Sequence, residues 1–279
     1  MQCVSPYFSM KSGSVPCGVC MACRINRTEE WATRIEHEMH GKDSCFITLT
    51  YGVDPETLNK KHLQDFLKRL RYHLGDKKIK YYGCGEYGDL NGRPHYHLII
   101  IGWKPEDLYV SLSKHNTSVL LAGIWNYGFV SVGACSAQSI RYVTGYVRKK
   151  LYGKRRSEYG EKVPPFAVMS LGIGKDYCLD NKEKILRGYL TKKGIKYGLP
   201  RYYKKKIVES IDGAEELFRL KAEGHEVEKI IAEVGIDKAG DVSEYMERLH
   251  RFSDLRASDR ERRKADLKAR ENRKRKGIL

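Results

Sequence analysis

Hydrophobic residues recur at helical spacing in two segments of the N-terminal half of the chain. Trp31, Ile35 and Met39 lie four residues apart, which predicts a helix from about residue 24 to 40 with one apolar stripe. Residues 57–74 place leucines and a phenylalanine at the same spacing and predict a second amphipathic helix.

Four other segments have the β-branched and aromatic content of strands, at residues 45–51, 80–87, 95–101 and 128–132. The Asn-Gly pair at residues 91–92 is a strong hairpin signal, so the second and third of these strands should be antiparallel neighbours. Further helices are expected through residues 120–125 and over residues 139–151. The pattern predicts an α+β fold with a mainly antiparallel sheet and helices packed around it.

Two histidines, His95 and His97, lie at the start of the third predicted strand. Residues two apart on a strand share one face, and paired imidazoles suit a divalent metal. Glu86 lies near the turn end of the neighbouring strand and can bring a carboxylate to the same metal, which would leave coordination positions open for catalysis. The alternatives are one core and one surface histidine, and a solvated acid at a strand end.

Three cysteines, Cys17, Cys20 and Cys23, have the spacing Cys-x2-Cys-x2-Cys, which can clamp one zinc ion if a fourth ligand joins them. The candidates for that fourth ligand are Cys3 first, then His37 and His40. Such a zinc would stabilise the fold and would have no open position for catalysis. The alternative is that the three cysteines pack and that the first two cap a helix start.

Two tyrosines, Tyr142 and Tyr146, share one face of the helix expected over residues 139–151, and Lys149 and Lys150 continue that face one turn on. Such an aromatic pair, taken alone, is most often core. Beside a metal triad, however, a phenolate could attack a metal-polarised phosphate, with nearby cations favouring the anion over its neutral form, whose pKa is about 10. The combination predicts cleavage of a phosphodiester.

The net charge is +17, from 52 Lys and Arg against 35 Asp and Glu, which indicates a polyanionic partner such as nucleic acid. No segment approaches the roughly 20 apolar residues of a membrane span, and the N-terminus does not resemble a signal peptide, so we expect a cytoplasmic protein. A phosphate-binding Gly-x4-Gly-Lys-Ser/Thr motif does not occur in the sequence. Any unwinding would therefore need a partner helicase.

The chemistry-bearing segments occur in the order of the three motifs of HUH endonucleases that initiate rolling-circle replication. These segments are residues 46–50, residues 93–97 with Glu86 upstream, and residues 142–149. The two-tyrosine arrangement resembles the replication initiators of microviruses, and the N-terminal cysteines with Trp31 resemble the gokushovirus branch. The resemblance covers roughly residues 3–205 and implies an HUH-like central antiparallel sheet that carries the histidines and faces the tyrosine helix. It also favours zinc at the cysteine cluster with Cys3 as the fourth ligand.

The resemblance implies nicking of single-stranded viral origin DNA in a bacterial host. Mg²⁺ or Mn²⁺ on Glu86, His95 and His97 would polarise the phosphate, and a tyrosine would form a 5′-phosphotyrosine, with Lys149 preferred as the neutralising cation. The free 3′-OH would serve a host polymerase, and a host helicase would unwind the DNA. Alternatives are a relaxase or transposase of the same chemistry, or a zinc-stabilised DNA-binding protein without catalysis.

Three regions are expected: a cysteine-rich segment over residues 1–26, an endonuclease domain over 27–206, and a helical, basic C-terminal region over 207–279. Residues 256–276 hold eleven Lys and Arg against four Asp and Glu, which fits a solvated helix or a DNA-binding arm. Candidates for further contacts with single-stranded DNA are Lys150, Arg201, Tyr202, Tyr203 and Lys204. For the segment around Tyr202, a solvated strand edge is an equally good interpretation.

Overall fold

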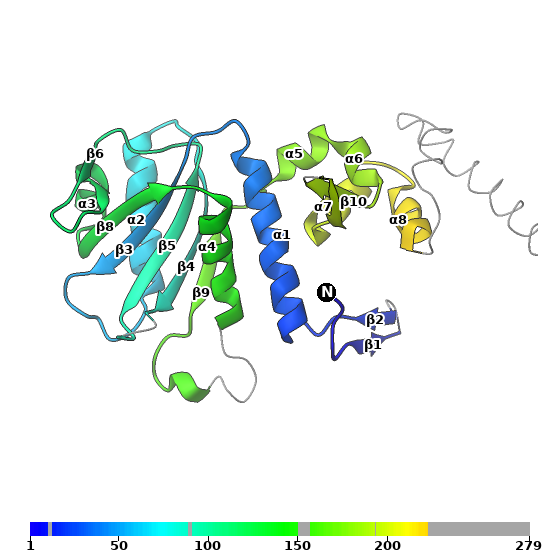
Figure 1. Ribbon diagram of the computed structural model, residues 1–279, viewed down its shortest axis with the longest axis horizontal. Helices are drawn as coiled ribbons and strands as arrows, with labels where there is room; N and C mark the ends of the chain where they lie inside the picture. Colours follow the sequence, from blue (N-terminus) through cyan, green and yellow to red (C-terminus); the bar gives the residue numbers. More distant parts are fainter. Residues whose placement is uncertain (11–12, 89–90, 150–156, 193, 223–279) are drawn as a thin grey trace, which may run out of the picture. The chain divides into compact units, whose positions relative to one another are not determined.

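The computed structural model describes residues 1–10, 13–88, 91–149, 157–192 and 194–222 (Figure 1). The chain forms two compact units, Met1–Asp180 and Asn181–Leu279, and each is described by itself. In the described residues, we find no helix that is both long and apolar enough to span a membrane.

A five-stranded antiparallel sheet lies at the centre of the first unit, with the strand order β8-β3-β5-β4-β9. Its strands are β3 (Ser44–Tyr51), β4 (Lys80–Tyr87), β5 (Pro94–Ile101), β8 (Gly128–Ala134) and β9 (Phe166–Met169). The predicted α+β class and antiparallel sheet are therefore confirmed. The pairing of β4 with β5 is confirmed as well, and Gly92 in their connection has φ +61°, which favours glycine.

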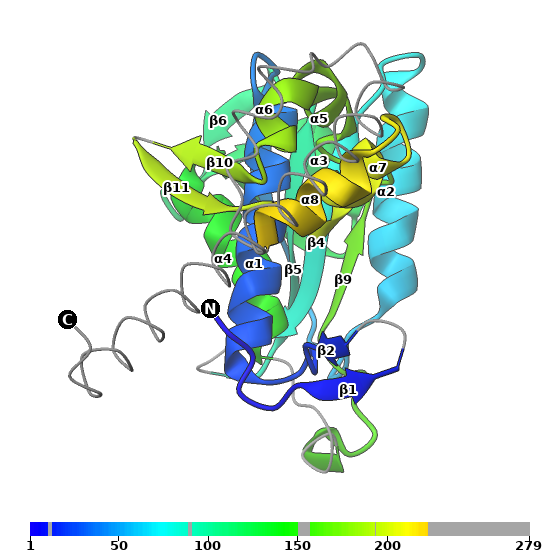
Figure 2. The same ribbon diagram turned by 90° about the vertical axis from the view of Figure 1, so that its right-hand side faces the viewer.

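Two helices cover one face of this sheet and two cover the other. Helices α2 (Lys60–Leu74) and α3 (Val119–Trp125) pack on one face, and α1 (Met21–Met39) and α4 (Ala137–Lys149) on the opposite face. Figure 2 shows β4, β5 and β9 between α1 on one side and α2 on the other. The short helix α5 (Lys175–Asp180) ends the unit.

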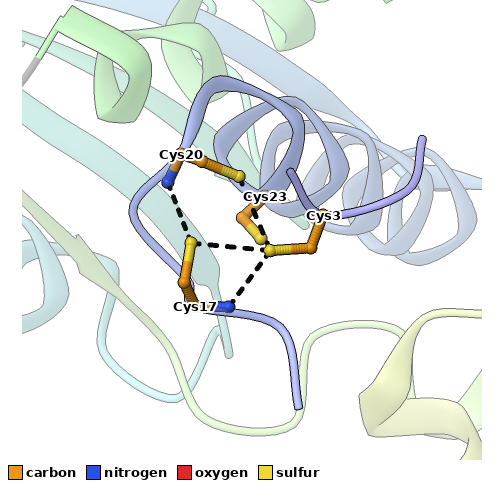
Figure 3. Close-up of side chains that lie close together, drawn as sticks. All are labelled: Cys3, Cys17, Cys20 and Cys23. Carbon is orange, nitrogen blue, oxygen red and sulfur yellow. Dashed lines mark hydrogen bonds between the residues drawn. The ribbon is translucent and has the colours of Figure 1, made fainter. Parts of the chain in front are cut away.

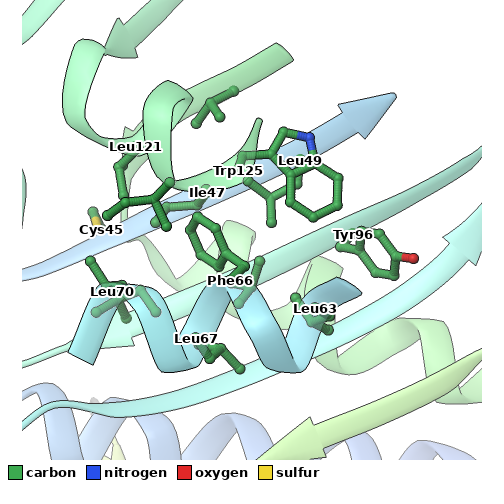
Figure 4. Close-up of a cluster of buried hydrophobic side chains, with 14 of the residues drawn as sticks. Cys45, Ile47, Leu49, Leu63, Phe66, Leu67, Leu70, Tyr96, Leu121 and Trp125 are labelled. Atoms are coloured by element: carbon green, nitrogen blue, oxygen red, sulfur yellow. The ribbon is translucent and has the colours of Figure 1, made fainter. Parts of the chain in front are cut away.

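The core beneath α2 follows from the helical spacing seen in the sequence. Leu63, Phe66, Leu67 and Leu70 are all buried against alternate residues of β3, including Ile47 (Figure 4). The helix begins after Asn59, whose side chain accepts a hydrogen bond from the backbone N–H of Lys61. The opposite face of the sheet is left for residues of a different kind, and it carries the candidate site.

Two small hairpins complete the first unit. The first pairs β1 (Tyr7–Ser9) with β2 (Gly13–Val15), and the second pairs β6 (Leu108–Val110) with β7 (Asn116–Ser118).

The second unit contains a hairpin and short helices within its described part. Its elements are α6 (Lys182–Leu186), β10 (Tyr189–Lys192), β11 (Ile195–Gly198), α7 (Arg201–Val208) and α8 (Ala214–Ala222). The predicted basic run at residues 256–276 lies outside the described residues, as does the rest of the expected C-terminal region beyond residue 222.

Candidate metal centre and tyrosine pair

Glu86, His95 and His97 lie side by side on the central sheet. In the register of β4 and β5, Glu86 is opposite His95 and Cys84 is opposite His97, so the acid and both imidazoles share one face. Glu86 Oε1 lies 2.8 Å from His95 Nε2 and 3.3 Å from His97 Nε2. One ligand atom from each side chain falls within 4.8 Å of the others, so the three could hold a metal ion.

Hydrogen bonds at Nδ1 orient the two imidazole rings. His95 Nδ1 lies 3.1 Å from the carbonyl oxygen of Arg93, which can only accept, so this nitrogen carries the proton. His97 Nδ1 lies 3.0 Å from Thr48 Oγ1. Both rings therefore turn Nε2 toward Glu86, and partners of this kind at Nδ1 are typical of metal-binding histidines.

Thr48 was not among the predicted site residues, although the sequence does carry a signal for it. It is a polar residue on a strand that also supplies Ile47 and Leu49 to the core. Alternation places it on the face opposite the core, and the pairing of β3 with β5 puts it across from His97. Only the register, which the sequence does not give for this pair of strands, identifies its partner.

Glu86 is 4 % exposed. Burial alone would raise the pKa of Glu86, but hydrogen bonds and charge interactions with His95 and His97 leave the pKa below its usual value. The group is thus an anion at neutral pH, which is the form that binds a metal.

The rings of Tyr142 and Tyr146 pack directly on His97. Tyr146 stacks on the imidazole with a centroid distance of 5.4 Å and an interplanar angle of 8°. Tyr142 meets the same ring edge-on at 5.1 Å, and the centroids of the two tyrosines are 4.8 Å apart. Phe46 stacks against His97 as well, at 5.5 Å. Helix α4 therefore brings both hydroxyl-bearing rings to the candidate metal centre.

The two tyrosines differ in their surroundings. Tyr142 is 50 % exposed, whereas Tyr146 is 4 % exposed. Burial raises the pKa of Tyr146, and its hydrogen bond with Tyr142 adds to the rise. Lys149 lies in α4, but its side chain is outside the described residues, and Lys150 lies outside them altogether.

The four predicted zinc ligands also meet, at the start of α1 (Figure 3). Cys3 Sγ lies 3.6 Å from Cys17 Sγ and 3.8 Å from Cys20 Sγ. A tetrahedron with Zn–S bonds of about 2.3 Å has S–S edges of about 3.8 Å, so the sulfur spacing fits a zinc ion. Cys3 is the fourth member of this group, whereas His37 stacks on Tyr177.

Hydrogen bonds prepare part of this cluster for metal. The side chain of Ser5 and the backbone N–H groups of Cys20 and Val19 lower the pKa of Cys17 to about 6. Burial raises the pKa of Cys23 to about 12. A metal ion would be needed to hold all four as thiolates.

The predicted DNA-contacting residues of the second unit are not equally available. Arg201 and Lys204 are exposed on α7 and Tyr202 is half-buried, but Tyr203 is completely buried in the core of its unit. A base cannot stack on a ring without exposed surface, so Tyr203 is removed from the candidate surface. The helical spacing of Tyr203 and Ile207 explains its burial.

Comparison with known proteins identifies the family. Residues 44–151 match the family model of the replication-associated protein ORF2, and this range includes the Glu-His-His group and both tyrosines. The chain is 32 % identical over 217 residues to Replication-associated protein ORF2 of Spiroplasma virus 4, an alignment that covers 70 % of this chain and 68 % of the relative. This chain belongs to that family.

Two further relatives have similar names. Replication-associated protein ORF4 of Chlamydia phage 1 is 35 % identical over 215 residues, which is 68 % of this chain and 52 % of the relative. Replication-associated protein VP4 of Bdellovibrio phage phiMH2K is 31 % identical over 214 residues, which is 70 % of this chain and 67 % of the relative. None of the solved structures matches the chain significantly.

Proposed function

We propose that this protein initiates rolling-circle replication by nicking single-stranded viral origin DNA with a tyrosine nucleophile. Its relatives are named replication-associated proteins of phages, which supports a role in viral DNA replication. The observation that carries the chemistry is the position of His97, which contacts Glu86 and also packs against the rings of Tyr142 and Tyr146. That arrangement supports an endonuclease of the HUH type.

Glu86, His95 and His97 would hold Mg²⁺ or Mn²⁺. The donor set is one buried carboxylate oxygen and two imidazole nitrogens, and Mn²⁺ accepts both kinds of ligand while Mg²⁺ prefers the oxygen. When bound, the ion would polarise the scissile phosphate. Three protein ligands leave positions free for the DNA.

Tyr142 or Tyr146 would then attack the phosphorus atom. The phenolic oxygen forms a bond to phosphorus, the bond from phosphorus to the 3′-oxygen breaks, and the proton lost by the phenol goes to that leaving oxygen. The products are a 5′-phosphotyrosine and a free 3′-OH. Attack by a 3′-OH reverses the step, so rejoining consumes no nucleotide. A second tyrosine permits a second cleavage while the first is occupied, and Lys149 or Lys150 would neutralise the developing charge.

The cysteine cluster would hold a structural zinc ion through Cys3, Cys17, Cys20 and Cys23. Four thiolates complete a tetrahedral shell, so this site supports the fold and takes no part in cleavage.

The biological setting proposed here is replication in the cytoplasm of a bacterial host. A host polymerase would extend the 3′-OH, and a host helicase would separate the strands. A relaxase or a transposase would use the same residues, and the names of the relatives favour replication over those two settings.

Cleavage can be tested by incubating the protein with labelled single-stranded origin DNA and Mn²⁺. We expect an adduct that resists denaturation and maps to Tyr142 or Tyr146. Replacing both residues with Phe should abolish it while the protein stays folded. An adduct that persists in the double variant, or none in the wild type on cognate DNA, would contradict the proposal and favour a DNA-binding protein without catalysis.

A further inference from the structure

A cavity of about 290 Å³ lies next to the tyrosine pair, on the face of the sheet that is covered by α1 and α4. Tyr146 and Cys84 form the wall nearest the candidate metal centre. The remaining wall comes from Arg27 and Trp31 of α1, Tyr82 and Gly85 of β4, and residues 165–167 and 169 in and before β9. The proposed cleavage chemistry does not use this space.

The walls of the cavity are mainly aromatic and apolar. The rings of Trp31 and Tyr82 are in contact, with centroids 5.2 Å apart, and Phe166 adds a third aromatic side chain. The guanidinium of Arg34 lies 4.1 Å above the ring of Trp31 and holds the indole in place. Flat, rigid walls of this kind suit a flat aromatic ligand.

Polar groups at the cavity suit the same kind of ligand. Tyr82 is fully buried, and its hydroxyl has no hydrogen-bond partner among the described residues. A buried hydroxyl normally has a partner, and the heteroatoms at the edge of a nucleobase could provide one. Arg27 is exposed and can pair with a phosphate. Along the outer edge of β9, no described strand uses the backbone groups.

We propose that this cavity binds one nucleobase of the single-stranded DNA, next to the scissile phosphate. Tyr146 both lines the cavity and stacks on His97, so a strand whose phosphate reaches the metal centre has its neighbouring base within reach of the cavity. Holding that base would fix the register of the strand and would favour some sequences at the nick. The position relative to the nick rests on the proposed function, whereas the binding of a base can be measured without cleavage.

The binding test uses full-length protein with His95→Ala, because His95 does not line the cavity and its loss should prevent cleavage. The probes are oligothymidylate of about 12 nucleotides and an abasic chain of the same length. Ala167→Phe fills the cavity from β9, and it should reduce the preference for the base-bearing probe at least about fivefold, the lower end for loss of one stacked base. Ala167→Val, which adds less volume, is the matched control and should have a smaller effect.

Arg27→Gln should weaken binding of both probes alike, whereas Lys68→Gln, on α2 at the opposite face of the sheet, should have less effect. An unchanged base preference in folded Ala167→Phe protein would overturn the proposal.

A second measurement keeps the test decisive if Ala167→Phe does not fold. Oligonucleotides that carry 5-iodouracil at single positions are irradiated with protein that has an intact cavity, and the crosslinked residues are mapped by mass spectrometry. Crosslinks to Trp31, Tyr82 or Phe166 from positions beside the mapped nick support the proposal. Crosslinks confined to other residues overturn it. If the wild type does not nick but the cavity still crosslinks, the proposed cleavage fails and base binding stands.

Discussion

His97 is the residue at which the two tyrosines can be told apart. Both rings contact its imidazole, but Tyr142 has half of its surface exposed and Tyr146 has almost none. A phosphate arriving from solvent therefore meets the hydroxyl of Tyr142 without a rearrangement of α4. Spacing in the sequence makes the two positions equivalent, and the exposure of each ring depends on how the helix packs on the sheet.

We expect Tyr142→Phe to abolish the first cleavage and Tyr146→Phe to slow it less than about tenfold, or about 1.4 kcal/mol in the barrier. Tyr146→Phe should instead impair the second cleavage, and with it the release of joined circles. The measurement is single-turnover adduct formation on origin DNA, followed by a joining assay. Tyr109→Phe, at an exposed tyrosine of β6, is the control and should match the wild type. Equal loss of the first cleavage in both single variants would show that the exposed ring has no priority.

Glu38 is a buried charge that connects three segments of the first unit. Its carboxylate accepts hydrogen bonds from Lys42, from Lys80 at 2.8 Å and from the backbone N–H of Gly174 at 2.7 Å. Gly174 has φ +75°, a conformation that glycine adopts without strain. The contact ties α1 to β4 and to the turn before α5.

We expect Glu38→Gln to lower the free energy of unfolding by about 2 kcal/mol at pH 7, since hydrogen bonds to a charged group are lost while the side chain keeps its shape. Lys42→Gln, at a side chain 43 % exposed, should cost less than about 1 kcal/mol and serves as the control. Urea denaturation measures both. A loss in Glu38→Gln no larger than in Lys42→Gln would contradict a structural role for this carboxylate.

The same comparison has a defined dependence on pH. Burial would raise the pKa of Glu38, but the hydrogen bonds from Lys42, Lys80 and Gly174 leave the pKa below its usual value of 4.5. A group with a lowered pKa stabilises the fold above the unfolded-state pKa and loses that contribution as pH falls through the folded-state pKa. The difference between wild type and Glu38→Gln should therefore be constant above about pH 5.5 and shrink below 4.5.

At the scale of elements, local signals predicted most of the first unit. The helical stripes of α1 and α2 and the hairpin between β4 and β5 follow from spacing and turn chemistry, and the hairpin alone brings Glu86 to His95. The place of α4 against the face that carries His97 could not be derived in this way, because periodicity identifies the buried side of a helix and not its partner. The family resemblance supplied that expectation. For Glu38 and Thr48, whose partners are distant in the sequence, even the resemblance gave no signal.

The N-terminal element should depend on metal for its order. Cys3 reaches Cys17 and Cys20 across the β1–β2 hairpin, so a zinc ion would tie the first residues of the chain to the start of α1. We expect Cys3→Ser to weaken zinc binding by more than about 100-fold and to lower the melting temperature. Zinc content by emission spectroscopy and thermal unfolding with and without a chelator measure both effects. Cys135→Ser, outside the cluster, should retain the metal; equal zinc content in the two variants would rule out Cys3 as a ligand.

At the scale of the whole molecule, affinity and chemistry should have separate origins. The net charge of +17 is spread over many cations, whereas cleavage is proposed to depend on a few side chains at one face of a sheet. Long-range attraction to phosphates does not need the metal centre, because it comes from released counterions.

Replacing His95 and His97 with Ala should therefore remove cleavage and leave binding of single-stranded DNA nearly intact. In both proteins the logarithm of the affinity should fall linearly with the logarithm of salt concentration, at about 0.7 per contacted phosphate, with slopes that agree within about one contact. Fluorescence anisotropy over a salt series gives the slopes, and the adduct assay gives the cleavage. Thermal unfolding of the variant checks that the sheet is retained. A parallel loss of folding and binding would instead identify the two histidines as structural residues, because a metal site that serves only the reaction does not hold the charged surface in place.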